Sequence, residues 1–200
     1  MITKKLVPFG TTVFAEMTAL AQEHGAINLA QGFPDFEGPE DIVEAAVRAL
    51  RSGNNQYARS RGHTPLVEAI AGVQSRYYGM DYDPMSEAVV FSGDTEGIAA
   101  SLLGILNPGD EVILFEPCYE SYPPSIALSG ASPRFLTLRF PDFGLDEDAL
   151  RALINPRTRM IVLNTPMNPT GKVFTEDELR LIASICREND LLALTDEVYE

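Results

Sequence analysis

The sequence predicts an α/β protein in which helices cover a mostly parallel sheet. From residue 88 onward, short apolar segments alternate with longer helix-like segments. The short segments, such as EVILFEP and RMIVLNTP, are apolar at consecutive positions rather than at every second position. Strands with that pattern are buried on both faces, as parallel strands are when helices connect them. These observations indicate a doubly wound α/β domain.

The first part of the chain is predicted to form helices joined by loops. Thr11 or Thr12 is placed to cap a helix that ends at Gly25, a residue type common just past a helix. A loop rich in glycine and proline follows. Pro39 then starts a second helix, which Gly53 closes.

Near Gly38 the loop-rich start gives way to regular elements, which predicts a domain boundary there. We expect residues 1–38 to form an N-terminal arm and part of a smaller domain, and residues 39–200 to form a large domain. Strands are predicted at residues 88–93, 111–117, 133–140, 159–166 and 191–198, and further helices at residues 64–78, 95–106, 119–130, 145–154 and 175–190.

The composition excludes several functional classes. A net charge of −14 repels nucleic-acid phosphates and anionic membrane surfaces. No apolar run approaches a membrane span in length, and no secretory signal follows the N-terminal lysines. Neither Cys118 and Cys186 nor His24 and His63 have metal-binding spacing. We therefore expect a cytoplasmic protein with reduced thiols that binds neither nucleic acid nor membrane.

Ligands of doubly wound sheets bind at the carboxyl ends of the strands, so the residues that follow each predicted strand indicate the site. Residues 92–95, 116–122, 164–171 and 196–199 occupy these places and carry polar residues, glycine, proline or tyrosine. One such end is ordinary turn chemistry. Four ends of this kind predict a single site.

The segment SGDTEG resembles an anion cradle at the start of a helix. Gly93 allows close approach of a ligand, and the amides of Asp94 and Thr95 lack helical acceptors there. A phosphate suits such a cradle, although a plain helix cap by Asp94 or Thr95 is the simpler alternative. Neither a Walker A loop nor GxGxxG follows a strand, so the usual nucleotide signatures are missing.

Two further strand ends offer groups for a flat ligand. Tyr119 follows the segment EVILFEP and could stack on an aromatic ring, or it could be a core tyrosine. Asn168 lies in PMNPTG, where Pro166 and Pro169 stiffen the loop and Gly171 permits a tight turn. Its amide can donate and accept, or it can be a turn asparagine.

Asp196 is the most specific of these residues. A carboxylate at the inner end of an apolar strand is costly to bury unless a cation pairs with it, and a protonated ring nitrogen would supply that cation. A helix-capping acid is the alternative, and Tyr199 offers a phenol nearby. A phosphate, an aromatic ring, a ring oxygen and a protonatable ring nitrogen occur together in pyridoxal phosphate.

These motifs carry a family resemblance. The chain resembles the N-terminal half of class I and II aminotransferases, pyridoxal-phosphate enzymes of fold type I, and within them the branch of kynurenine, glutamine and methionine aminotransferases. The resemblance runs through INLAQGFPDF, NQYARSRGHTPL, FSGDTEG, FEPCYESY, NTPMNPTGKVFT and TDEVY. It implies a mostly parallel sheet flanked by helices, with an N-terminal arm from a smaller domain, and incomplete at the C-terminus.

The resemblance also implies roles for individual residues. Gly93, Asp94 and Thr95 would hold the cofactor phosphate, Tyr119 would stack on the ring, Asn168 and Tyr199 would bind its phenolic oxygen, and Asp196 would pair with the ring nitrogen. Tyr57 would reach the phosphate of a neighbouring subunit, which implies a homodimer with shared active sites. Gly32, Phe33 and Asn168 would line the substrate pocket.

Three positions depart from the family pattern. Asp94 is an acid where the family has a small or neutral residue, so we expect its side chain to point away and only its amide to bind phosphate. Met167 replaces a residue that is often polar and is expected to tune substrate contacts. The Schiff-base lysine has no counterpart, since the lysines are Lys4, Lys5 and Lys172, and Lys172 is expected to be a surface charge.

The resemblance therefore implies an aminotransferase that moves an amino group between an amino acid and a 2-oxo acid. Because the catalytic lysine is missing, we expect these 200 residues to be a fragment that is inactive alone. Two alternatives remain open: β-elimination at a carbon–sulfur bond with the same cofactor, and a non-catalytic fragment or cofactor-binding module of the same fold.

Overall fold

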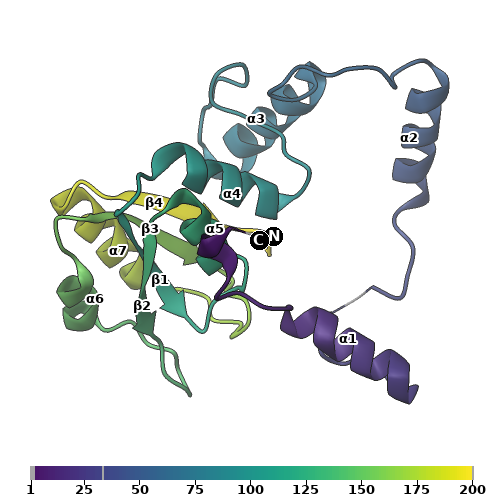
Figure 1. Cartoon of the computed structure of the whole chain (residues 1–200). Helices are drawn as coiled ribbons and strands as arrows, with labels where there is room; N and C mark the ends of the chain where they lie inside the picture. Colours follow the sequence, from purple (N-terminus) through teal and green to yellow (C-terminus); the bar gives the residue numbers. More distant parts are fainter. Residues whose placement is uncertain (1–2, 33, 200) are drawn as a thin grey trace. The chain divides into compact units, whose positions relative to one another are not determined.

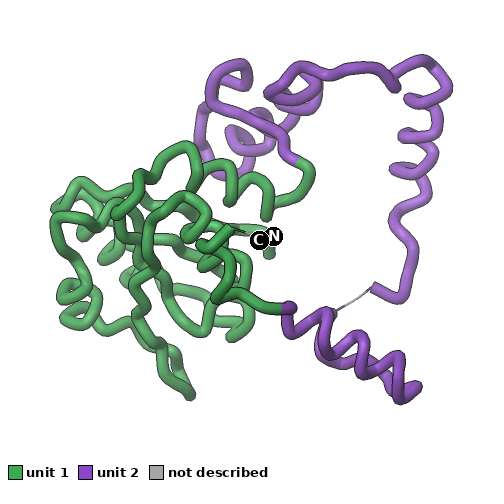
Figure 2. The backbone as a smooth tube through the Cα atoms, viewed as in Figure 1, with its two compact units in different colours: residues 1–10, 92–200 green, residues 11–91 purple. Residues whose placement is uncertain are grey.

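A computed structural model describes residues 3–32 and 34–199 of the chain. These residues form two compact units, shown in different colours in Figure 2. Unit 1 joins residues 3–10 to residues 92–199, and unit 2 spans the described part of residues 11–91. The domain boundary expected near Gly38 lies within unit 2 and stays a prediction about the complete family fold.

Unit 1 contains a four-stranded parallel sheet with the order β2-β1-β3-β4 (Figure 1). The strands are β1 (Glu111–Glu116), β2 (Ser132–Thr137), β3 (Thr158–Asn164) and β4 (Leu192–Asp196). The predicted parallel α/β architecture is confirmed. Because β1 and β3 are central, they are almost fully buried, whereas β4 pairs only with β3 among the described strands and leaves Leu192 51% exposed.

Helices cover both faces of this sheet. They are α4 (Asp94–Ile105), α5 (Tyr122–Ser129), α6 (Glu147–Leu153) and α7 (Glu176–Glu188). Alternation along β1 divides the core, because successive side chains point to opposite faces. Val112 and Leu114 join a cluster that includes residues of α4 and α5, and Ile113 and Phe115 join one that includes residues of α6 and α7. The result is a three-layer unit in which the carboxyl ends of the parallel strands lie at one edge.

Residues 88–93 are not a strand, which corrects the prediction for that segment. A strand requires a partner for its backbone groups. The Val90 amide instead donates to the carbonyl of Arg61, at 3.0 Å, and Val89 and Phe91 are more than one-third exposed. The apolar residues of this segment therefore do not form a β-strand, because its backbone does not pair with a neighbouring strand.

Unit 2 contains α1 (Val13–His24), α2 (Glu40–Arg51) and α3 (Thr64–Tyr78). The predicted cap of α1 is confirmed, since the Thr12 hydroxyl accepts from the Ala15 amide at 3.2 Å and Gly25 has a φ of 59°. No helix in the described part of the chain combines the length and apolarity needed to cross a membrane.

Lys172 is not the surface charge that the sequence suggested. Its side chain is only 7% exposed, and its Nζ lies 2.8 Å from Glu178 Oε1 and 4.6 Å from the centre of the Phe174 ring. Glu178 also accepts from the amides of Leu145 and Thr175, at 3.1 and 2.8 Å. This carboxylate therefore ties the loop that follows β3 to the start of α7.

Glu111 is a buried carboxylate at the opposite, amino-terminal end of the sheet. It accepts hydrogen bonds from Asn155 Nδ2 and Arg157 Nε, both at 2.8 Å, and Arg134 lies at 3.5 Å. The hydrogen bond from Asn155, followed by that from Arg157, lowers the pKa of Glu111 below its usual value. These contacts join the start of β1 to the loop before β3.

We predict that Glu111→Gln makes unfolding less dependent on pH in the acid range. A lowered folded-state pKa contributes stability above the unfolded-state value of about 4.3, and this contribution is lost as the pH falls through the folded-state value. Urea unfolding between about pH 3 and 6 measures the difference. Glu147→Gln, an exposed ion-pair residue of α6, serves as control. Parallel pH profiles for wild type and Glu111→Gln would contradict the prediction.

Candidate active site at the carboxyl edge of the sheet

The carboxyl ends of the parallel strands bring together most of the predicted site residues in unit 1. Asn164, the last residue of β3, lies beside Asp196, the last residue of β4, in the strand register. Tyr119 follows β1, and Asn168 follows β3. Polar side chains far apart in sequence therefore meet at one edge, as the strand topology requires.

Asp196 is held at several points. It is 5% exposed, and its Oδ2 accepts from the Tyr122 hydroxyl at 2.5 Å while its Oδ1 accepts from the Val198 amide at 3.2 Å. Its backbone carbonyl accepts from the Thr165 amide at 3.2 Å and from Asn164 Nδ2 at 3.0 Å. These hydrogen bonds hold both the backbone at the end of β4 and the orientation of the Asp196 carboxylate.

The Asp196 carboxylate has neutral donors but no cationic partner among the residues that the structure describes. A buried carboxylate normally has a cation or a metal beside it, because desolvation of an isolated charge is costly. Tyr122 donates to one oxygen of Asp196 and the Val198 amide to the other, and a carboxylate oxygen can accept two hydrogen bonds. The site therefore suits a ligand that brings a protonated nitrogen.

Tyr122, the first residue of α5, is a site residue that the sequence reasoning missed. It is 2% exposed, and its ring meets the Tyr119 ring edge to face, with centroids 5.6 Å apart. Burial raises the pKa of Tyr122, as do its hydrogen bond to Asp196 and the nearby negative charges. The hydroxyl therefore stays protonated and donates to Asp196.

Asp94 lies at the start of α4, near enough to Asp196 for the two carboxyl groups to influence each other. The expectation that its side chain points away from a bound phosphate stays a prediction. Burial raises the pKa of Asp94, and the charge of Asp196 and a hydrogen bond with it raise it further. Two carboxyl groups thus share this edge, which favours a proton on one of them.

The first turn of α4 has the geometry of an anion cradle. Gly93 precedes the helix with a φ of 100°, a conformation that glycine adopts without strain. Asp94 and Thr95 occupy the first two helical positions and are exposed, and amides in a first turn have no intrahelical acceptor. The Ser92 amide, by contrast, already donates to Glu96 Oε2 at 2.7 Å.

Asn168 is held in the loop after β3. Its amide nitrogen donates to Asn164 Oδ1 at 2.7 Å, and its Nδ2 donates to the Tyr199 hydroxyl at 3.3 Å. The tight turn predicted at Gly171 is confirmed, since its φ is 72° and its amide donates to the Met167 carbonyl. Asn168 and Tyr199 can therefore bind one acceptor together.

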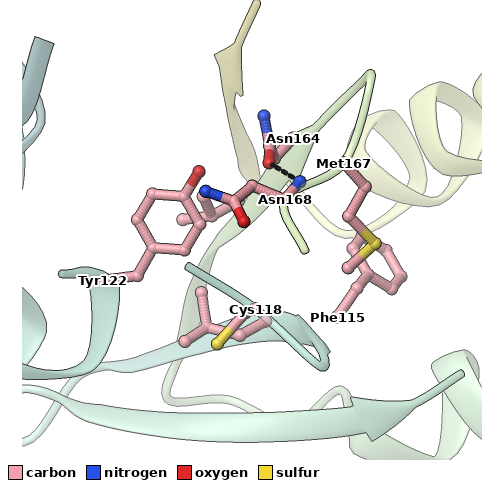
Figure 3. A pocket seen from close by; sticks show the side chains of 8 residues that line it. Phe115, Cys118, Tyr122, Asn164, Met167 and Asn168 are labelled. Atoms are coloured by element: carbon pink, nitrogen blue, oxygen red, sulfur yellow. Dashed lines mark hydrogen bonds between the residues drawn. The ribbon is translucent and has the colours of Figure 1, made fainter. Parts of the chain in front are cut away.

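A small cavity lies between the β1–α5 segment and the loop after β3. Figure 3 shows Tyr122 and Asn168 on facing sides of it, with Cys118 and Met167 contributing to its wall. Met167 is 4% exposed and packs with the core cluster of Phe115. Its expected influence on substrate contacts stays a prediction.

The remaining predicted site residues belong to unit 2. Tyr57 is fully exposed and borders a shallow open hollow together with residues of the α2–α3 connection. Gly32 is exposed, and a Cβ there would contact nothing within 4 Å. Phe33 lies outside the described residues. The roles expected for these three positions stay predictions.

The chain is similar to proteins of known function. Residues 24–200 match the sequence profile of the family described as aminotransferase class I and II. The methionine aminotransferase of Escherichia coli is 42% identical, over 98% of this chain and 51% of its own length. The kynurenine–oxoglutarate transaminase of Dictyostelium discoideum is 36% identical, over 99% of this chain and 50% of its own length.

Solved structures show the same similarity. The structure of N-succinyldiaminopimelate aminotransferase from Mycobacterium tuberculosis has a TM-score of 0.95 and 49% identity, covering 100% of this chain and 53% of that chain. The chain thus spans about half the length of the curated relatives that it matches. The predicted branch is confirmed by the methionine and kynurenine relatives, whereas the motifs did not single out an N-succinyldiaminopimelate enzyme.

We predict that Cys118 reacts slowly with iodoacetamide. Burial, aided by the charge of Glu116, raises the pKa of the Cys118 thiol to about 11. At about pH 8 its thiolate fraction is therefore about a hundredfold lower than that of an ordinary cysteine. Because the thiolate is the form that reacts with iodoacetamide, labelling is slow. Mass spectrometry of a Cys186→Ser background isolates this thiol. Labelling as fast as that of a free cysteine peptide would contradict the prediction.

Proposed function

The chain belongs to the family of class I and II aminotransferases, and on this basis we propose that it forms the cofactor cradle of a pyridoxal-phosphate-dependent enzyme. The reaction is transfer of an amino group between an amino acid and a 2-oxo acid. The observation that carries the proposal is the buried Asp196 carboxylate, which has hydrogen-bond donors but no cation beside it among the described residues. A pyridine nitrogen that carries a proton supplies that cation.

Asp196 would hold the proton on the ring nitrogen. Bound pyridoxal phosphate supplies an electron sink for the substrate's Cα, and the sink is effective when the ring nitrogen is protonated. Because the carboxylate is fixed through Tyr122, Val198 and its own backbone, it needs little reorganisation to do so. Preorganised charge of this kind is among the larger contributions to catalysis.

The phosphate and the ring have matching partners in unit 1. The exposed first turn of α4, with Gly93, Asp94 and Thr95, suits the phosphate. The side chain of Tyr119, half-buried beside Tyr122, suits one face of the ring. Asn168 and Tyr199, already hydrogen-bonded to each other, suit the phenolic oxygen. Asn168, Gly32 and Phe33 are proposed to contact the substrate.

We assign the covalent, catalytic role to none of the lysines of this chain. Lys172 is engaged with Glu178 at 2.8 Å and is mostly buried, so its amine is held within the protein. Lys4 and Lys5 belong to the N-terminal segment, and Lys5 Nζ donates to the Leu128 carbonyl at 2.8 Å. We propose that residues 1–200 hold the cofactor without a covalent bond and that turnover requires a lysine supplied from elsewhere.

The proposed enzyme is a cytoplasmic homodimer. Tyr57 is fully exposed, as expected of a side chain that completes the phosphate site of a neighbouring subunit. The relatives act on methionine, kynurenine and N-succinyldiaminopimelate according to their names, which supports an amino-acid donor and a 2-oxo acid acceptor as the substrate class.

We predict that Asp196→Asn weakens binding of pyridoxal phosphate about a hundredfold, because it removes the charge that faces the ring nitrogen and leaves that cation unpaired. Equilibrium dialysis of the purified chain with the cofactor measures the affinity. Asp148→Asn, on the exposed first turn of α6, makes the same chemical change away from the site and should bind like wild type.

Borohydride treatment of the same samples tests the absence of a covalent bond. We expect no cofactor to remain attached to the wild-type chain after denaturation, since Lys172 is held by Glu178 and Lys5 by the Leu128 carbonyl. Equal affinity of wild type and Asp196→Asn would refute the proposed cradle. A lysine modified after reduction would instead refute the non-covalent arrangement.

A further inference from the structure

The loop between β3 and α7, residues 165–175, carries Asn168 at the carboxyl edge of the sheet. We infer that Lys172 and Glu178 are positioning residues, whose buried ion pair fixes this loop and thereby directs the Asn168 side chain at the phenolic oxygen of the cofactor. Both residues act through Asn168 rather than through a contact of their own with the ring. This role rests on the proposed function for its ligand, but the contacts that support it are this chain's own.

The ion pair between Lys172 and Glu178 is enclosed by protein. The two side chains are 7% and 17% exposed, and Lys172 Nζ lies 2.8 Å from Glu178 Oε1. The same Nζ lies 4.6 Å from the ring centre of the buried Phe174. A lysine side chain loses much rotamer freedom when it is buried, and a buried ion pair often contributes little net stability. A role in fixing one conformation of the loop therefore accounts better for this pair than a role in stability does.

Glu178 is a rigid anchor for the pair because it also caps α7. Its Oε2 accepts from the Thr175 amide at 2.8 Å, and its own amide donates to Thr175 Oγ1 at 3.3 Å. Its Oε1 accepts from the Leu145 amide at 3.1 Å. Burial raises the pKa of Glu178, but the hydrogen bonds from Lys172 and from these two amides outweigh burial and lower it. The carboxylate is therefore ionised at neutral pH and held on the α7 side.

The backbone of Lys172 is linked to Asn168 across the turn. The Lys172 carbonyl accepts from the Met167 amide at 2.9 Å, and the Met167 carbonyl accepts from the Gly171 amide at 2.7 Å. Met167 directly precedes Asn168, whose own amide donates to Asn164 Oδ1 at 2.7 Å (Figure 3). The position of Asn168 is thus set from one side by β3 and from the other by Lys172.

Two substitutions remove the ion pair, and each has a matched control. Lys172→Met removes the ammonium group and keeps a long side chain, and Lys4→Met makes the same change at an exposed residue of the N-terminal segment. Glu178→Gln removes the charge and keeps a residue type that suits the same capping position. Glu176→Gln makes that change on the same turn of α7, in an exposed ion pair with Arg180.

The first experiment is hydrogen exchange followed by NMR, without cofactor. We expect Lys172→Met and Glu178→Gln to speed exchange of the Asn168 and Gly171 amides about tenfold, because the turn opens more often without the ion pair. The amide of Val162, in the middle of β3, should keep its rate, and both control variants should match wild type. Unchanged exchange at the turn overturns the inference. An equal acceleration at Val162 indicates a general loss of stability and overturns it as well.

The second experiment compares two ligands by equilibrium dialysis: pyridoxal phosphate and 3-deoxypyridoxal phosphate, which lacks the phenolic oxygen. Wild type should prefer pyridoxal phosphate about tenfold, because only this ligand offers an acceptor to the loop. Asn168→Ala gives the preference without the Asn168 contact. Lys172→Met should fall to the Asn168→Ala value and bind the 3-deoxy ligand within about twofold of wild type. Lys4→Met should keep the wild-type preference.

A wild-type preference retained in Lys172→Met overturns the inference. Equal losses for the two ligands also overturn it, because they indicate general structural support or a covalent bond from the lysine. If wild type binds both ligands equally, the phenolic oxygen is not bound at this loop, and the inference is again overturned.

Failure of the proposed function would give a different result. Wild type would then bind neither ligand, while the hydrogen exchange measurement would still decide whether the ion pair fixes the loop. If Lys172→Met does not fold, Glu178→Gln decides both measurements against Glu176→Gln, with the same expected and contrary outcomes.

Discussion

The carboxylate of Asp196 is the constraint on which the carboxyl edge of the sheet depends. A charge buried at the end of an apolar strand must have its hydrogen-bonding capacity met, and here the donors come from α5, from the backbone after β4 and, through the carbonyl, from the end of β3. These hydrogen bonds to Asp196 bring three separate segments of the chain together. The same contacts leave the buried carboxylate with the capacity to accept a further hydrogen bond.

The three-layer architecture makes such an edge possible. Because all four strands are parallel, their carboxyl ends fall on one side, and helices on both faces exclude water from β1 and β3. At the amino end of the sheet, the charge of the buried Glu111 carboxylate is instead neutralised within the protein, by Arg157 and Arg134. Glu111 is thus paired with arginines within the protein, whereas Asp196, at the carboxyl edge, has no cation beside it in the part of the chain that the structure describes.

Much of this could be predicted from the sequence, because local signals were strong. Apolar runs marked the four observed strands, caps marked α1, and the polar strand ends marked Asn168 and Asp196. The failures involve tertiary partners: residues 88–93 are apolar but find no strand to pair with, and Lys172 is buried because Glu178 and Phe174 surround it. Tyr122 was missed because nothing local shows that a helix-start tyrosine faces an acid on β4.

The position of β4 in the sheet has a consequence for handling the isolated chain. Its outer side offers backbone donors and acceptors without a neighbouring strand among the described residues, next to an exposed Leu192. An open, apolar strand of this kind is a template for pairing with another molecule. Self-association through β4, and with it the tendency to form ordered aggregates, would therefore rise with protein concentration and be relieved by a charged residue in place of Leu192.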